Sequence, residues 1–201
     1  MEKFRKKRLE VFYETIVVIR IWVIKTKNFN LLVSTSRYNE TNASAELWFT
    51  LFIAGDSYPI ISNLEFLGLL TALSNIDAKL VIKKIKEILH EDPSFFKFIL
   101  KIVPIDFVCE TNLKVISQIV KNHYTEFIDK TDTFKIDLKR RKNNNIERER
   151  LIKYVANNIE NRVNLENPDK IIRIELLGNF CGVAFIKPDE IISLKSEKYA
   201  D

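Results

Sequence analysis

The order in which strand-like and helix-like apolar segments follow one another is the feature that most constrains this chain. Short apolar or alternating runs are typical of strands, and apolar positions three or four residues apart are typical of amphipathic helices. From residue 28 the segments read strand, helix, strand, strand, helix, strand. Their ranges are 28–36, 42–54, 58–63, 66–74, 78–91 and 95–105. This β-α-β-β-α-β order predicts a ferredoxin-like domain.

A second unit of helices and strands follows. Residues 111–128 and 146–159 have helical spacing, and residues 133–138 alternate as a half-buried strand. Two further apolar runs, 170–177 and 180–186, flank Gly178-Asn179, a pair typical of a tight hairpin turn. Because no Pro-, Gly- or Ser-rich linker separates the two units, we expect them to pack together. The predicted class is α+β, with domains at residues 28–104 and 105–201.

Residues 1–27 form an appendage that reads equally well as a helix or a β-rich strand. Its basic start and its apolar stretch at 16–24 superficially resemble a secretion signal. Glu14 and Arg20 interrupt the apolar character, and no small-residue cleavage site follows. A membrane span needs about 20 mostly apolar residues, and the sequence contains no such stretch. We therefore expect neither a signal peptide nor a membrane anchor.

Positive charge is concentrated between residues 135 and 153. The chain of 201 residues has a net charge of +5. This segment holds eight basic and three acidic residues, so it carries a net +5 by itself. A local surplus of this kind favours a polyanionic partner, although a solvated lysine-rich surface is the alternative. The basic residues are Lys135, Lys139, Arg140, Arg141, Lys142, Arg148, Arg150 and Lys153.

The chemistry of this segment suits phosphate groups. Arginine forks pair with phosphate oxygens, and lysine acts as a point charge. Asn143 offers an amide at the start of the next helix, where free backbone N–H groups attract anions. Arg140 and Arg141 are neighbours on a strand, so they should point to opposite faces. A solvated turn, with Glu147 and Glu149 pairing the arginines, is the alternative reading.

Motifs of common catalytic and metal sites are absent from the sequence. Its four glycines form neither GxGxxG nor GxxxxGK[ST], and no serine lies in GxSxG. Two cysteines without a CxxC, and two isolated histidines, suggest neither a zinc site nor a disulfide framework. We expect no catalytic residue, no bound metal and no cofactor, and a reducing cytoplasmic location. Packing in the core is the expectation for Cys109, Trp22 and Trp48, and packing in the core or at an edge for Cys181. Stacking on bases is the alternative for the two tryptophans.

Several segments together resemble the THUMP domain, in the order in which they occur along residues 101–196. They are KIVPIDFVCET, FKIDLKRRKNN, the helix start RERLI, VNLENPDKIIRIEL and FCGVAFIK. The preceding residues, about 28 to 100, resemble the ferredoxin-like domain that usually accompanies THUMP. The resemblance leaves out the appendage at the N-terminus. It implies an N-terminal ferredoxin-like domain followed by a THUMP-like α/β domain.

The layout is similar to that of stand-alone tRNA acetyltransferase accessory proteins. The resemblance implies a non-catalytic adaptor that binds tRNA for N4-acetylcytidine formation by a separate enzyme, which uses acetyl-CoA and ATP. A docking subunit for methylation or thiolation, an enzyme with an unrecognised site, and a protein scaffold are the alternatives. The expected RNA-binding residues are Lys135, Lys139, Arg140, Arg141, Lys142, Asn143, Arg148, Arg150 and Lys153.

Overall fold

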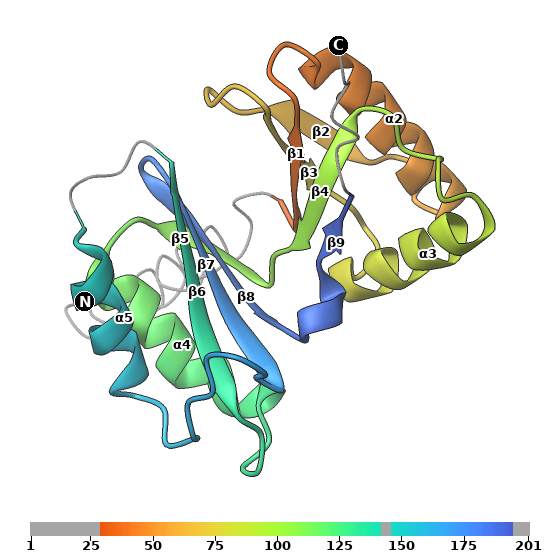
Figure 1. The fold of residues 1–201 in the computed structure, drawn as a ribbon. Helices are drawn as coiled ribbons and strands as arrows, with labels where there is room; N and C mark the ends of the chain where they lie inside the picture. The colour runs from red at the N-terminus through yellow and green to blue at the C-terminus, as the bar shows by residue number, and fades with distance from the viewer. Residues whose placement is uncertain (1–28, 142–145, 195–201) are drawn as a thin grey trace, which may run out of the picture.

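Two β-sheets, each covered by helices on one face, make up the part of the chain that the structure describes (Figure 1). The structure is a computed structural model and describes residues 29–141 and 146–194. The α+β class predicted from the sequence is confirmed, with a ferredoxin-like unit preceding the second α/β unit. Among the described helices, none is long and apolar enough to cross a membrane.

The first sheet is antiparallel and has the order β2-β3-β1-β4-β9. Helices α2 (Glu40–Ile53) and α3 (Ala78–Glu91) cover one of its faces. Asp77 caps α3 by accepting hydrogen bonds from the backbone N–H groups of Lys79 and Leu80, as a residue before a helix commonly does. The strands are β1 (Leu31–Thr35), β2 (Ile60–Asn63), β3 (Leu69–Leu73), β4 (Ile99–Pro104) and β9 (Ile192–Ser193).

The second sheet has the order β5-β8-β7-β6, and its β6–β7 pair is parallel. Helices α4 (Leu113–Phe127) and α5 (Arg148–Ala156) cover one face, where Ile172, Ile174 and Leu176 lie in the core. The Gly178-Asn179 turn joins β7 to β8 as predicted, with Gly178 at a φ of +61°. The strands are β5 (Phe107–Glu110), β6 (Phe134–Arg141), β7 (Lys170–Leu177) and β8 (Phe180–Ile186).

The predicted strand at residues 95–105 was placed too early, since β4 begins at Ile99. The Glu46 carboxylate accepts hydrogen bonds from the backbone N–H groups of Lys97, Phe98 and Ile99, at 2.7, 3.1 and 2.9 Å. These bonds fix the preceding aromatic residues as a loop against α2 rather than as a strand.

Four other elements depart from the sequence prediction. Strand β6 continues past residue 138 to Arg141, because it pairs with β7 along its whole length. Helix α5 is shorter than the predicted range 146–159. Strands β5 and β9, of four and two residues, were not predicted because such short strands show no clear apolar alternation. Strand β9 follows the short 3-10 helix η1 (Pro188–Glu190) and returns the chain to the first sheet beside β4.

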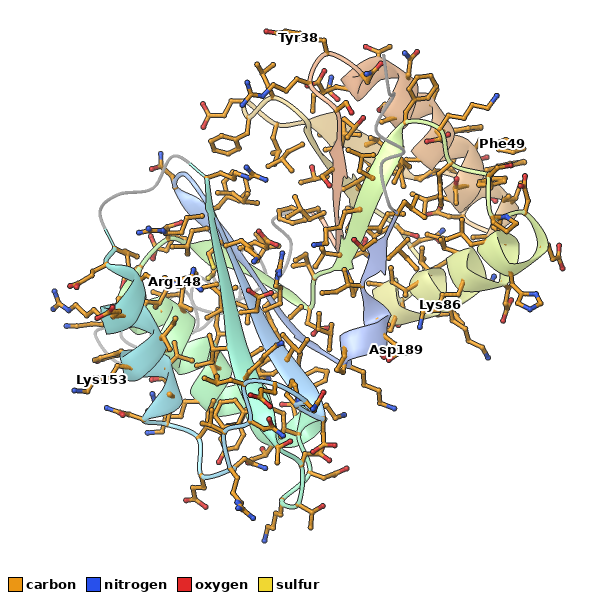
Figure 2. All side chains as sticks on the ribbon, viewed as in Figure 1. Tyr38, Phe49, Lys86, Arg148, Lys153 and Asp189 are labelled. Atoms are coloured by element: carbon orange, nitrogen blue, oxygen red, sulfur yellow. The ribbon has the colours of Figure 1, made fainter. Side chains whose placement is uncertain are left out.

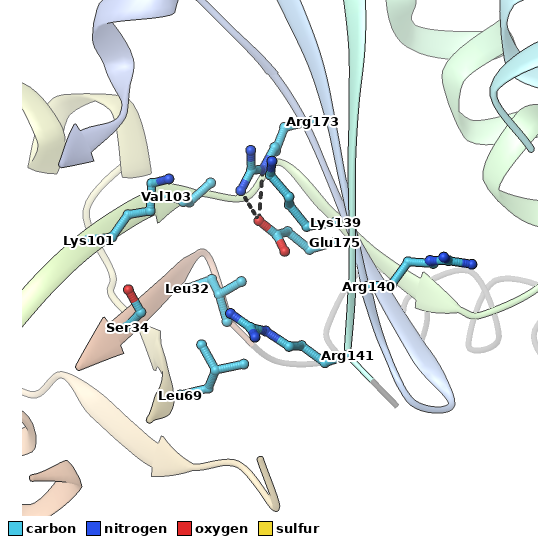
Figure 3. Close-up of a pocket in the computed structure, with 10 residues that line it drawn as sticks. All are labelled: Leu32, Ser34, Leu69, Lys101, Val103, Lys139, Arg140, Arg141, Arg173 and Glu175. Carbon is cyan, nitrogen blue, oxygen red and sulfur yellow. Dashed lines mark hydrogen bonds and ion pairs between the residues drawn. The ribbon is translucent and has the colours of Figure 1, made fainter. Parts of the chain in front are cut away.

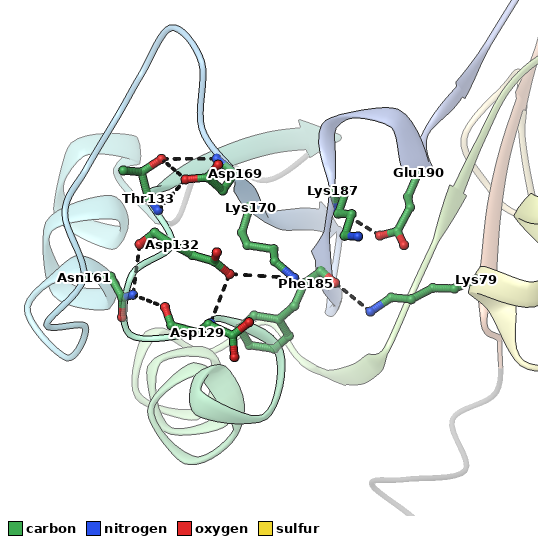
Figure 4. A network of polar contacts seen from close by, with 10 residues as sticks. All are labelled: Lys79, Asp129, Asp132, Thr133, Asn161, Asp169, Lys170, Phe185, Lys187 and Glu190. Atoms are coloured by element: carbon green, nitrogen blue, oxygen red, sulfur yellow. Dashed lines mark hydrogen bonds and ion pairs between the residues drawn. The ribbon is translucent and has the colours of Figure 1, made fainter.

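The uncovered faces of the two sheets meet through a shared apolar cluster. Leu32, Leu69 and Val103 from the first sheet and Leu177 from the second belong to it. A polar contact adds to this junction, because Lys79 on α3 donates a hydrogen bond to the Phe185 carbonyl on β8 (Figure 4). The two units are therefore joined by both apolar and polar contacts.

A separate polar network holds the start of β6. Thr133 is bonded to the Asp169 carboxylate through both its backbone N–H, at 2.8 Å, and its hydroxyl, at 2.7 Å. The Asn161 amide donates to the carbonyl oxygens of Asp129 and Asp132 (Figure 4). The loop between α5 and β7 is thereby tied to the strand that leads to the basic segment.

Candidate nucleic-acid interface

A cavity of about 260 Å³ lies between the two sheets, where their uncovered faces meet. We call it the cleft (Figure 3). It is rich in cationic side chains, with five cations and one carboxylate among its lining residues. The lining residues are Leu32, Ser34, Leu69, Lys101, Val103, Lys139, Arg140, Arg141, Arg173 and Glu175.

The alternation of β6 divides the basic segment between two faces of the sheet. Lys139 and Arg141 project into the cleft, while Arg140 points the other way (Figure 3). Arg140 Nη1 lies 3.4 Å from the carbonyl oxygen of Ile146, ahead of α5. The prediction that Arg140 and Arg141 face opposite sides is confirmed (Figure 3), and Arg140 is nevertheless one of the residues that line the cavity.

A buried ion network forms the floor of the cleft. Arg173 is only 4% exposed and pairs with Asp137 and with Glu175, whose Oε1 lies 2.6 Å from Arg173 Nη2. Burial alone would raise the pKa of Asp137, but Arg173 and Lys139 outweigh it and lower that pKa. Since Arg173 is committed to two carboxylates, it serves the cleft as a fixed support.

The cations placed to meet a ligand come from both sheets. Lys101 on β4 reaches into the cleft from one side, and Lys139 and Arg141 on β6 from the other (Figure 3). Burial lowers the pKa of Lys101, and the nearby charge of Arg173 lowers it further. Lys139 Nζ lies 3.3 Å from Asp137 Oδ1 and is half exposed. An anion in the cleft would relieve the repulsion among these like charges.

Other residues expected at the site lie elsewhere. Arg148 Nη1 donates a hydrogen bond to the Leu138 carbonyl oxygen at 2.8 Å. This bond gives Arg148 a partner within the fold, between α5 and β6. Arg150 and Lys153 are exposed on α5, the helix that covers the sheet face opposite to the cleft. Lys135 is the second residue of β6, at the end of the strand farthest along the chain from Arg141. Lys142 and Asn143 fall outside the described residues.

Sequence reasoning missed two residues of the cleft, Lys101 and Arg173. A signal for Arg173 is present, because Arg173 and Glu175 interrupt the apolar run IIRIELL at alternate positions. Two charged residues on one face of an otherwise buried strand indicate that they pair with each other, or that this face belongs to a functional site or an interface. Lys101 is a single charge in a strand, and nothing local distinguishes it from an exposed edge residue.

Comparisons with known proteins agree with this architecture. The crystal structure of PH1313 from Pyrococcus horikoshii Ot3 matches with a TM-score of 0.58 and 18% identity, over 80% of this chain and 55% of that one. The crystal structure of TrmN from Thermus thermophilus matches with a TM-score of 0.51 and 9% identity, over 79% of this chain and 46% of that one. This chain thus aligns with about half the length of either structure.

At these identities the two structures support the fold alone. No match to this sequence was found among curated proteins. The family model for the THUMP domain matches residues 110–185, which run from the end of β5 to the end of β8 and include both helices of the second unit. Residues 110–185 of this chain are therefore a THUMP domain.

Proposed function

We propose that this protein binds tRNA in and around the cleft and presents it to a separate modifying enzyme. The observation that carries the proposal is the set of cations that two sheets direct into one cavity, Lys101 from β4 and Lys139 and Arg141 from β6. Phosphates dominate the affinity of proteins for nucleic acids, and lysine and arginine are the side chains that neutralise them.

The form of the site supports RNA over an extended DNA duplex. A-form RNA hides the base edges of its deep groove, so proteins recognise it by phosphates, 2′-hydroxyls and single-stranded segments. A cavity of about 260 Å³ is large enough for a phosphate or a single base but far too small for the width of a duplex. A THUMP domain, described in tRNA-modifying proteins, supports tRNA as the RNA class.

An acetyltransferase that forms N4-acetylcytidine is the proposed partner enzyme. The support is the layout, a ferredoxin-like unit followed by a THUMP-like unit, which is similar to that of stand-alone accessory proteins of tRNA acetylation. In this proposal the chain supplies tRNA binding and the partner supplies acetyl-CoA and ATP chemistry. Cytoplasmic location is part of the same proposal.

Nucleoside profiling of tRNA tests the proposal most directly. We expect tRNA from a strain that lacks this protein to lose N4-acetylcytidine and to regain it when the protein is restored. Loss of a methylated or thiolated nucleoside instead would identify the alternative, a docking subunit for that modification. An unchanged profile would overturn the adaptor function.

A reconstitution tests the non-catalytic role separately. Purified protein should retain tRNA on a filter at low salt, yet form no N4-acetylcytidine from acetyl-CoA, ATP and tRNA when no other protein is present. Acetylation by the purified chain alone would show that it is itself the enzyme.

A further inference from the structure

The outward face of α2 is apolar, and no element among residues 29–141 and 146–194 covers it. Trp48, Phe49, Phe52 and Ile53 are 45%, 52%, 50% and 45% exposed. We call these four residues the α2 aromatic face. Trp48 was predicted to lie in the core, and the structure corrects that prediction. The core contacts of the helix come instead from Leu47, Thr50 and Leu51, which are fully buried on its inward side.

The aromatic rings of this face are held in place by contacts within the protein itself. Trp48 stacks on Phe52 one turn later, with centroids 5.4 Å apart and an interplanar angle of 7°. Phe49 stacks on Phe95 of the neighbouring loop at 6.5 Å. Ordered aromatic side chains lose little conformational freedom on binding, which is why they are enriched among residues that dominate interface energies.

Helix α2 itself offers no cation that could hold a phosphate. Helix α2 contains two charged residues, and both are acidic. Glu40 accepts a hydrogen bond from the Gly68 backbone N–H at 2.6 Å, and Glu46 holds the loop before β4. The four side chains of the α2 aromatic face are uncharged. A surface of this kind fits an apolar protein partner.

The area of the face favours a concave partner over a second copy of this chain. An aromatic side chain buries about 150–250 Å², so this half-exposed set offers about 300–450 Å². Two copies packed face to face would bury about 600–900 Å² in total, below the roughly 1,000 Å² of a specific interface. A groove that surrounds the convex helix would bury its flanks as well. Trp48 with Phe52, and Phe49 with Ile53, have the spacing of four residues that helix-in-groove recognition uses.

We propose that the α2 aromatic face docks into an apolar groove of the modifying enzyme, an inference that rests on the proposed adaptor function. Phe49 lies on the side of the first unit away from the second unit that carries Arg148 (Figure 2). The enzyme docked on α2 therefore leaves the cleft between the units open to RNA. Docking and RNA binding use different surfaces of one chain.

The test separates these two surfaces with neutral substitutions. The variant W48Q/F52Q removes two exposed rings without adding charge. The matched control Y58Q/L80Q removes two exposed apolar side chains outside α2. Each variant is expressed in the deletion strain, tRNA nucleosides are quantified, and tRNA affinity is measured with purified protein. We expect W48Q/F52Q to bind tRNA as wild type does but to restore about tenfold less of the lost nucleoside. The control should restore it fully.

The outcomes distinguish failure of this inference from failure of the adaptor function. Full restoration by a folded W48Q/F52Q overturns the docking inference while the adaptor function stands. Failure of wild type itself to restore any nucleoside overturns the adaptor function and the docking inference with it. A wild-type dimer in light scattering that W48Q/F52Q makes monomeric would assign the face to a second copy and overturn the proposal. Should W48Q/F52Q unfold, the single variants W48A and F52A, checked by thermal melting, carry the same comparison.

Discussion

The Lys79 ammonium lies 3.6 Å from Asp106 Oδ1, and this contact ties α3 of the first unit to the segment that leads into the second. The same nitrogen lies 4.5 Å from the centroid of the Phe127 ring on α4. Burial raises the pKa of Asp106, and the nearby Lys79 charge counteracts part of that rise. Lys79 therefore stabilises a buried carboxylate at the junction of the two units.

Replacement of Lys79 by Met should weaken the folded state. We expect a loss of about 1–3 kcal/mol at neutral pH, since a buried carboxylate would lose its partner. Lys86→Met is the control, because the Lys86–Asp189 pair also links the units but is exposed, and it should cost less than about 1 kcal/mol. Urea unfolding measures both.

The pH dependence of this loss has a definite sign. Asp106 has a raised folded-state pKa, so its contribution to stability is most favourable below its unfolded pKa and declines as pH rises through the folded one. Protonated Asp106 needs no cationic partner. The difference between Lys79→Met and wild type should therefore shrink as pH falls toward about 4. A difference that grows on acidification would contradict this account.

Charge reversal within the cleft should abolish tRNA binding, and the same reversal on α5 should not. K139E/R141E changes two cations that face the cleft, and R150E/K153E changes two on the covered side of the sheet. Both variants alter the net charge equally, so a long-range effect alone would affect them alike. We expect at least about a tenfold loss in affinity for K139E/R141E only.

Salt dependence checks the same pair of variants. Each lost phosphate contact should reduce the magnitude of the log–log salt slope by roughly 0.7–0.9. The slope should fall for K139E/R141E and stay nearly constant for R150E/K153E, as measured by filter binding at several salt concentrations. Equal losses in the two variants would move the RNA surface away from the cleft.

Lys101 should make tRNA binding sensitive to alkaline pH. Its pKa is lowered in the free protein by burial and by Arg173, so it loses its proton at a lower pH than an exposed lysine does. Phosphate in the cleft favours the protonated form, and affinity should decline on alkalinisation at a lower pH than the deprotonation of exposed lysines alone would cause. Lys101→Arg should remove much of this decline because arginine stays charged. An identical pH profile in wild type and variant would exclude Lys101 from the interface.

The two cysteines should be unreactive in the folded protein. Cys109 and Cys181 are register partners on β5 and β8, and both are buried. A hydrogen bond with the Cys109 thiol and burial raise the pKa of Cys181 well above its usual value, so its thiolate is scarce. We expect a thiol reagent at neutral pH to modify neither residue until denaturant is added, when both react. Rapid labelling of the native protein would contradict the structural role.

Local chemistry made much of the fold predictable. The Gly178-Asn179 pair fixed a hairpin, and Asp77 marked the start of a helix. The alternation of side chains along a strand also predicted that Arg140 and Arg141 point to opposite faces. Each of these predictions depends only on residues that lie close together in the sequence.

What the sequence could not reveal depends on contacts between distant segments. Lys101 lines the same cavity as Lys139 and Arg141 because the two sheets face each other. No residue spacing along the chain predicts that proximity. The bond from Arg148 to the Leu138 carbonyl oxygen was not predictable, because it forms only when α5 packs against β6. Trp48 was expected inside because aromatic residues usually are, yet Leu47 and Leu51 already fill that side of α2.

The two sheets are connected to each other at more than one place. The chain crosses the junction between them twice, between β4 and β5 and again through η1 to β9, while the Phe66 ring lies 3.3 Å from the place that a Cβ on Gly178 would occupy. Such a frame resists both twisting and opening, so the protein alone sets the width of the cleft. Under the proposed function, an RNA segment must already have, or adopt, the shape that fits the cleft, and the free-energy cost of that adjustment falls on the RNA.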